Sequence, residues 1–157
     1  MVLDGMAREV EPDDIPKLTM GLRGLIVSGE RLRNVLAHQL GLGPSDLVAL
    51  GHIHNDGPLT PRELAARMEV TSGSITALLD RVEKAGFVAR DANPQDRRSL
   101  LIRATPAGSH SMQWVYSHFD TAMRDALEEV HGFAIDQLAT ALTELARALE
   151  ARARAES

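Results

Sequence analysis

The chain has 157 residues, of which 44% are hydrophobic and 25% charged, so it is long enough to bury one hydrophobic core. It contains no cysteine, which excludes disulfides, cysteine nucleophiles and thiolate metal sites. No apolar run approaches the roughly 18 residues of a membrane-spanning helix, and the first residues lack the features of a signal peptide, so we expect a cytoplasmic protein without membrane contact.

The net charge of −5 is unevenly distributed along the chain. Residues 60–104 hold eight basic and six acidic side chains, a net charge of +2, and the remainder therefore carries −7. Nucleic-acid binding needs basic surface to neutralise phosphates, so the average charge argues against such a partner. The basic segment is the one part of the chain where that surface is expected.

The first half of the chain predicts a loose arm and two helices. Residues 1–14 are acidic and aperiodic, which is typical of a mobile arm. Apolar residues then recur at spacings of three and four over residues 15–39, the period of an amphipathic helix. A second helix is predicted to start at Gly43 or Ser45 and to end at residues 55–58.

Two short helices follow, each with its own start signal. Thr60 and Pro61 suit the N-cap and the first helical position, and Glu63 completes a capping box. Thr71 can cap the next helix, which is predicted to end just before Gly86. The apolar residues of that helix share one face: Ile75, Leu78, Leu79 and Val82.

The second half of the chain predicts a β-hairpin and two further helices. Residues 87–90 and 100–104 are short β-prone segments separated by polar turn residues, so we expect a hairpin with a basic tip. Thr105 and Pro106 start a long helix that Gly132 breaks. The last helix has an apolar seam of only two heptads, which favours packing against a partner helix: Ile135, Leu138, Leu142, Leu145 and Leu149.

Two helices with a tight connection, followed by a basic hairpin, are the pattern of a winged helix-turn-helix, and here the pattern falls inside the basic segment. The predicted fold class is therefore mainly α with a small β-hairpin wing. A helix that enters the major groove needs small or hydrogen-bonding residues at its N-terminus, and four such candidates are present: Thr71, Ser72, Ser74 and Thr76. Arg97 and Arg98 at the hairpin tip could reach the neighbouring minor groove.

Residues 70–108 resemble the DNA-binding core of the MarR family of bacterial transcription regulators. Three segments carry the resemblance: DRVEKAGFVAR at 80–90, NPQDRR at 93–98 and TPAG at 105–108. The resemblance implies a homodimer that binds a pseudo-palindromic operator in double-stranded DNA, usually as a repressor, and that is associated with the nucleoid. It also implies one domain over residues 15–157, with a winged-helix core at 44–104 and dimerisation helices at 15–40 and 105–153.

By match to the family motif, Ser72, Ser74 and Thr76 lie on the recognition helix. Arg98 corresponds to the arginine that enters the minor groove, and Asp96 is placed to hold it. Position 77 is alanine where many relatives carry a larger polar residue, so base readout here would rest on fewer side chains.

Each of these residues also has a purely structural interpretation. Serine and threonine favour helix starts wherever they occur. Arg81 and Lys84 either contact DNA or form a solvated face beside Asp80 and Glu83. The arginines of the hairpin tip could form an ordinary charged turn, but two adjacent arginines in an acidic chain favour a function.

Trp114 and His118 share one face of the long helix. Relatives in the family bind small aromatic acids or phenols between this helix and the DNA-binding domain, so the two side chains are candidates for a ligand pocket that relieves DNA binding. The alternative interpretation is that they pack against the first helix of the partner.

The remaining motifs do not predict catalysis or metal binding. Among the six histidines, His52 and His54 are two residues apart and face apart, and no two are spaced four residues apart on a helix, so we predict no metal site and no cofactor. No nucleotide loop or nucleophile motif is present, so we predict that the protein is not an enzyme. Two alternatives to a ligand-responsive regulator remain: a winged helix that docks another protein, and a DNA-binding protein without a ligand response.

Overall fold

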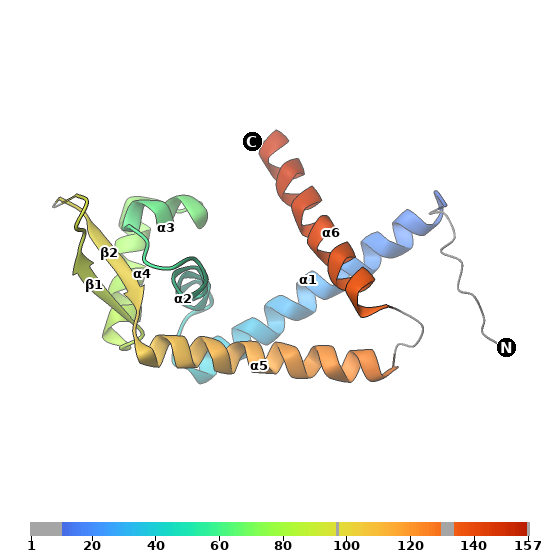
Figure 1. Cartoon of the computed structure of the whole chain (residues 1–157), viewed down its shortest axis with the longest axis horizontal. Coiled ribbons are helices and arrows are strands. Elements are labelled where there is room, and N and C mark those ends of the chain that lie inside the picture. Colours follow the sequence, from blue (N-terminus) through green and yellow to red (C-terminus); the bar gives the residue numbers. More distant parts are fainter. Residues whose placement is uncertain (1–10, 97, 130–133, 157) are drawn as a thin grey trace. The chain divides into compact units, whose positions relative to one another are not determined.

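The computed structural model of the chain describes residues 11–96, 98–129 and 134–156. In chain order the elements are α1 (Asp14–Gln39), α2 (Pro44–Asp56), α3 (Pro61–Arg67), α4 (Ser72–Lys84), β1 (Val88–Ala92), β2 (Leu100–Ala104), α5 (Pro106–Glu129) and α6 (Ile135–Ala155) (Figure 1). This order confirms the predicted fold class. Within the described ranges, no helix is both long and apolar enough to cross a membrane.

The chain divides into two compact units after Phe119, within α5. The first unit contains α1 to β2 and the first half of α5, and the second contains the rest of α5 and α6. Most of the predicted loose arm lies outside the described residues, but Asp14 already belongs to α1. The predicted break at Gly132 also lies outside them.

Both short helices begin at the predicted residues. The Thr60 hydroxyl accepts a hydrogen bond from the Glu63 N–H at 3.2 Å, and the Glu63 carboxylate accepts one from the Thr60 N–H at 2.7 Å. This capping box lowers the pKa of Glu63, because the Thr60 N–H and then its hydroxyl stabilise the charged carboxylate. At α4, the Thr71 hydroxyl accepts from the Ser74 N–H at 3.3 Å.

The end of α4 is joined directly to the hairpin and to α5. Gly86 has a φ of +83°, a conformation that glycine adopts without strain, and it turns the chain from α4 into β1. The Thr105 hydroxyl donates to the Gly86 carbonyl at 2.7 Å, and the Thr105 N–H donates to the Phe87 carbonyl at 2.9 Å. A Cβ on Gly108 would lie 2.0 Å from the Phe87 carbonyl oxygen, so the first turn of α5 packs on the backbone at the base of the hairpin.

The hairpin is antiparallel, with Val88 opposite Ala104 at its base and Ala92 opposite Leu100 near its tip. Leu59, in the loop between α2 and α3, extends this pairing on the other side of β2. Its N–H donates to the Ile102 carbonyl at 3.0 Å, and the Ile102 N–H donates back at 2.8 Å. This bridge attaches the wing to the helices of the core.

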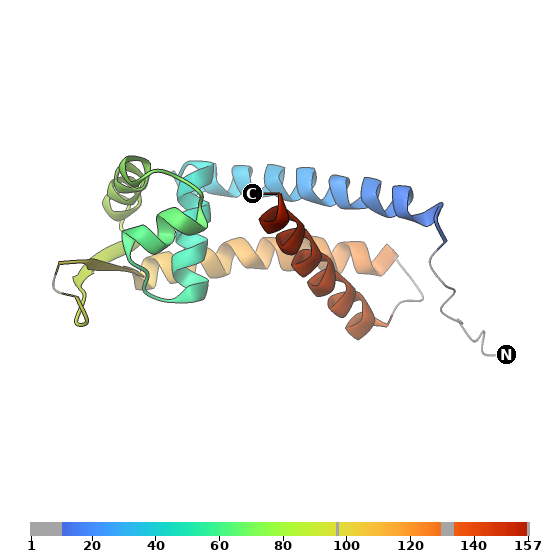
Figure 2. The ribbon, with the colours of Figure 1, turned by 90° about the horizontal axis from the view of Figure 1, so that it is seen from above.

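The core is built from α2, α3, α4 and the hairpin, which group together in both views of the ribbon (Figures 1 and 2), and from buried residues at the end of α1 and in the first half of α5. The predicted apolar face of α4 is buried, and burial of each such side chain stabilises the fold by about 1.5–3 kcal/mol. The other large side chains with almost no exposed surface come from α1, α2, α3 and β2: Leu36, Leu47, Leu50, Ile53, Leu64 and Ile102.

The long helices carry much apolar surface that the single chain leaves exposed. No described residue of α6 is buried, although its predicted seam is apolar. The exposed large apolar residues of α1 and α6 are Ile15, Leu18, Met20, Leu25, Ile26, Val27, Val35, Ile135, Leu142, Leu145 and Leu149. Monomeric proteins rarely expose apolar surface on this scale, so these faces indicate an interaction surface.

Candidate nucleic-acid interface

The first turn of α4 presents four exposed hydroxyl-bearing side chains: Thr71, Ser72, Ser74 and Thr76. The Thr71 and Ser74 hydroxyls lie 2.9 Å apart and share a hydrogen bond, and the Thr76 hydroxyl donates to the Ser72 carbonyl at 3.0 Å. Three of these hydroxyls, on Thr71, Ser74 and Thr76, therefore make local bonds within the helix, as the structural interpretation expects. Each hydroxyl has one donor and two acceptor positions, so these local bonds leave capacity for a ligand outside the helix.

Arg81 makes an ion pair that the sequence did not predict. Its Nη2 lies 2.6 Å from Oδ1 of Asp46 in α2, and its Nε lies within 3.2 Å of both carboxylate oxygens. The Asp46 side chain is 5% exposed and also accepts the Gly43 N–H at 3.2 Å. The hydrogen bonds to Asp46 raise the pKa of Arg81. Arg81 therefore joins α4 to α2, although 57% of its side chain remains exposed.

Arg81 and Lys84 form no ion pair with the neighbouring Asp80 and Glu83 in the described residues. Asp80 and Glu83 instead bind Arg90 of β1, whose Nη2 lies 2.6 Å from Asp80 and whose Nη1 lies 3.4 Å from Glu83. Lys84 is exposed at the end of α4 and has no acid partner in the described part of the chain. The two basic residues of this face thus differ: Arg81 is engaged and Lys84 is available.

The wing tip is shaped by its own polar groups. Asp96 accepts a hydrogen bond from the Arg98 N–H at 2.9 Å, so its carboxylate holds the backbone of the turn rather than the guanidinium. The Asn93 amide donates to the Ser99 hydroxyl at 2.8 Å, and the Asn93 side-chain carbonyl accepts the Gln95 N–H at 3.0 Å. Arg98 is exposed. Arg97, the other predicted wing arginine, lies outside the described residues.

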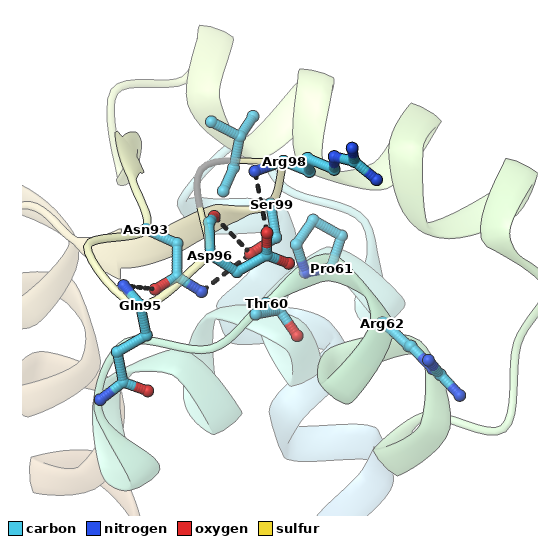
Figure 3. A pocket seen from close by; sticks show the side chains of 9 residues that line it. Thr60, Pro61, Arg62, Asn93, Gln95, Asp96, Arg98 and Ser99 are labelled. Atoms are coloured by element: carbon cyan, nitrogen blue, oxygen red, sulfur yellow. Dashed lines mark hydrogen bonds between the residues drawn. The ribbon is translucent and has the colours of Figure 1, made fainter.

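A groove of about 680 Å³ separates the wing tip from the start of α3. Arg62 and Arg98 are the two basic residues in its lining. Figure 3 shows both side chains pointing to the right of the view, away from the Asp96 carboxylate. The other lining residues are Thr60, Pro61, Asn93, Gln95, Asp96, Ser99 and Leu100.

A second cavity, of about 340 Å³, lies between α1, α2 and the first half of α5. Its polar lining consists of Arg33, His52, Asn55 and Tyr116, and the Asn55 amide donates to the Tyr116 hydroxyl at 2.6 Å. Its apolar lining is Leu47, Val48, Gly51, Met112, Val115 and Phe119. The Nε of Arg33 is buried and finds no hydrogen-bond partner in the described ranges.

The predicted pocket residues Trp114 and His118 contact each other and do not line this cavity. Their rings meet edge to face with centroids 4.4 Å apart, and the His118 Nδ1 lies 2.9 Å from the Trp114 carbonyl oxygen. Trp114 packs against the edge of the core. Trp114 and His118 lie on one face of α5 as predicted, but the 340 Å³ cavity lies against another face of that helix.

Three features of the site were not singled out from the sequence. Arg62 was counted with the basic segment but had no motif of its own. Asp46 gave no signal toward Arg81, which is 35 residues away. The bonds of Asn93 to the Gln95 N–H and to Ser99 hold the wing turn. The first of them could have been found from the sequence, because an asparagine side chain often bonds the backbone two residues further on in a turn.

Comparisons with known proteins agree with this geometry. A model of the MarR family matches residues 42–100, which contain α2, α3, α4, β1 and the wing tip. The transcriptional regulator YcgE of Bacillus subtilis is 37% identical over 102 residues, which cover 62% of this chain and 66% of YcgE. The chain thus spans just under two thirds of that relative.

Two further matches extend the comparison. The transcriptional repressor MdtR of Bacillus subtilis is 30% identical over 110 residues, which cover 70% of this chain and 71% of MdtR. The Staphylococcus aureus MepR–DNA complex has the same fold, with a TM-score of 0.58 and 19% identity over 82% of this chain and 97% of MepR. The sequence motifs, the winged-helix architecture and these matches together show that the chain belongs to the MarR family of transcriptional regulators.

Proposed function

We propose that the protein is a transcriptional repressor that binds double-stranded DNA with α4 in the major groove and the wing in the adjacent minor groove. The observation that carries the proposal is the exposure of basic side chains near the wing that have no acid partner among the described residues, on the same unit as the hydroxyl-rich start of α4. A helix and a wing so combined suit base readout and phosphate contact respectively. The protein would act in the cytoplasm, at the nucleoid.

The working form in this proposal is a homodimer. The apolar faces of α1 and α6 are exposed in the described part of the chain, and a second copy supplies an identical apolar surface. Two copies related by a two-fold axis present two recognition helices, which match an operator with inverted half-sites about one helical turn apart.

The proposal includes relief of DNA binding by a small ligand in the cavity beside α5. Support comes from Arg33, which is one of the residues lining this cavity and whose buried Nε has no partner in the described residues. A small aromatic molecule with a carboxylate or phenolate would satisfy that donor and fill the apolar part. Trp114 and His118 would then support the helix next to the ligand rather than contact it.

Selection from a library of genomic fragments, at a low and a physiological salt concentration, tests the DNA-binding proposal. We expect retained fragments to share an inverted repeat, and retention to fall steeply as salt rises. Retention without sequence preference, or no retention at physiological salt, would contradict the proposal and favour a winged helix that docks a protein.

Titration of the protein–operator complex with benzoate, as a probe aromatic carboxylate, tests the ligand proposal. Differential binding of the usual size, about 1–3 kcal/mol, would weaken operator binding by about 5- to 150-fold. Arg33→Met should abolish this response and leave operator affinity without benzoate unchanged. An equal response in both proteins would place the ligand outside this cavity. No response to benzoate or to phenol would contradict relief of DNA binding by such a ligand and leave a DNA-binding regulator without a ligand response.

A further inference from the structure

The described basic residues of the segment 60–104 fall into two classes, those with an acid partner and those without one, and their positions in the sequence do not distinguish the two. Four of them have an acid partner: Arg67 with Asp56, Arg81 with Asp46, Arg90 with Asp80 and Glu83, and Arg103 with Asp91. Three others have no acid partner within the described ranges: Arg62, Lys84 and Arg98.

This division matters because a paired cation has its charge already offset by a neighbouring carboxylate. A phosphate that approaches such a cation also approaches the carboxylate, so little is gained, whereas an unpaired cation on an exposed surface attracts the phosphate without that opposition. The basic residues that can contribute to phosphate neutralisation are therefore fewer than the count in the sequence suggests.

Two of the three unpaired cations line one groove. Arg98 comes from the wing tip and Arg62 is the second residue of α3, so they line the groove from its two walls, and both side chains point to the right in Figure 3. Arg62 is exposed, and the one carboxylate in the lining, Asp96, is engaged by the Arg98 N–H. The groove therefore has a basic residue on each wall.

We propose that Arg62 binds a DNA phosphate, on the opposite wall of the wing groove from Arg98, and that the two arginines hold one stretch of the sugar–phosphate backbone between the wing and α3. This inference rests on the proposed DNA-binding function. It assigns the contact to a residue outside both the recognition helix and the wing. Because the contact is to phosphate, it adds affinity and fixes the docking position without reading sequence.

The test is the salt dependence of binding to a fluorescently labelled random-sequence duplex, measured for the full chain and four variants. Each neutralised phosphate adds about 0.9 to the slope of log affinity against log salt. On a fourfold rise in salt, the affinity of the parent should therefore fall about 3.5 times further than that of Arg62→Gln for each lost contact. The ratio becomes about 12 if both copies of a dimer lose one contact. Arg62→Lys keeps the charge and should keep the slope.

Arg103→Gln is the matched control for Arg62→Gln, since it also removes one positive charge, here from β2 of the hairpin and from a residue paired with Asp91. Its slope should equal that of the parent. Equal reductions in Arg62→Gln and Arg103→Gln would show a general effect of net charge and overturn the proposal.

Arg98→Gln separates failure of this proposal from failure of the function on which it rests. A reduced slope in Arg98→Gln with an unchanged slope in Arg62→Gln would remove Arg62 from the interface and leave DNA binding intact. No salt-dependent binding by the parent chain would overturn the proposed function and this contact together.

Discussion

Single hydroxyls and carboxylates at the helix starts determine where α3 and α4 begin, and one of these groups titrates. Glu63 accepts the Thr60 N–H in the capping box, and this bond lowers the pKa of Glu63. A carboxyl group with a lower pKa in the folded than in the unfolded chain binds its proton less readily when folded. It therefore stabilises the fold above its unfolded pKa, and this contribution is lost as the pH falls through the folded value.

We expect Glu63→Gln to be less stable than the parent at neutral pH, with a difference that shrinks once the pH falls below the ordinary glutamate pKa of 4.5. Urea unfolding at a series of pH values from 7 downward measures the difference. Glu128→Gln is the control, because Glu128 is exposed and has no cap contact in the described residues. A difference between Glu63→Gln and the parent that stays constant with pH would exclude the capping carboxylate as its cause.

The first turn of α4 separates a structural threonine from a serine available for readout. The cap uses the Thr71 hydroxyl and the Ser74 backbone N–H, so Ser74→Ala retains the cap and Thr71→Ala removes it. Thr71→Ala should cost about 1 kcal/mol of stability. Ser74→Ala should reduce affinity for the selected operator while leaving affinity for random DNA unchanged. Equal losses on both duplexes, measured by fluorescence anisotropy, would argue against base readout by Ser74.

At the scale of the elements, local signals predicted most of the fold. Thr60 with Pro61, Thr71 and Gly86 mark the boundaries of α3 and α4, and the structure confirms each of them. These signals work because a cap or a C-terminal glycine involves residues within one turn. The Leu59–Ile102 bridge joins residues 43 positions apart in the numbering, and no local pattern specifies such a partner.

The candidate site likewise contains features that local sequence predicts and features that depend on residues far apart in the chain. The position of Ser74 and Arg98 could be predicted, because each belongs to a motif that one segment of sequence contains. The availability of a basic side chain could not, because it depends on whether a distant acid reaches it. Arg81, a predicted candidate for DNA contact, has its charge offset by the distant Asp46, whereas Arg62 has no motif and no acid partner among the described residues.

Removal of the Arg81 guanidinium tests the connection between α2 and α4. Arg81→Met leaves the Asp46 carboxylate buried, with the Gly43 N–H as its remaining partner in the described part of the chain, so we expect the free energy of unfolding in urea to fall by about 1–3 kcal/mol. Arg103→Met removes an exposed pair with Asp91, and the loss there should be below about 1 kcal/mol. Similar losses in the two variants would show that burial of Asp46 does not determine the strength of the connection.

At the scale of the whole molecule, the amount of exposed apolar surface on the long helices predicts association. Leu145→Glu places a charge in the apolar seam of α6, where Leu145 is 38% exposed in the single chain. Thr140→Glu is the control, because position 140 lies on the opposite face of the helix. Sedimentation velocity should show a monomer for Leu145→Glu and a dimer for Thr140→Glu and the parent. A parent chain that sediments as a monomer at micromolar concentration would contradict the homodimer.

The close approach of Gly108 to Phe87 determines how motion can pass through the first unit. Three backbone segments meet there, joined by the Gly108–Phe87 approach and by the bonds of Thr105: the end of α4, the base of the hairpin and the first turn of α5. A junction held by backbone contacts and hydrogen bonds is rigid rather than hinged. We therefore expect a tilt of the first turn of α5 to move the end of α4 and the base of the hairpin with it.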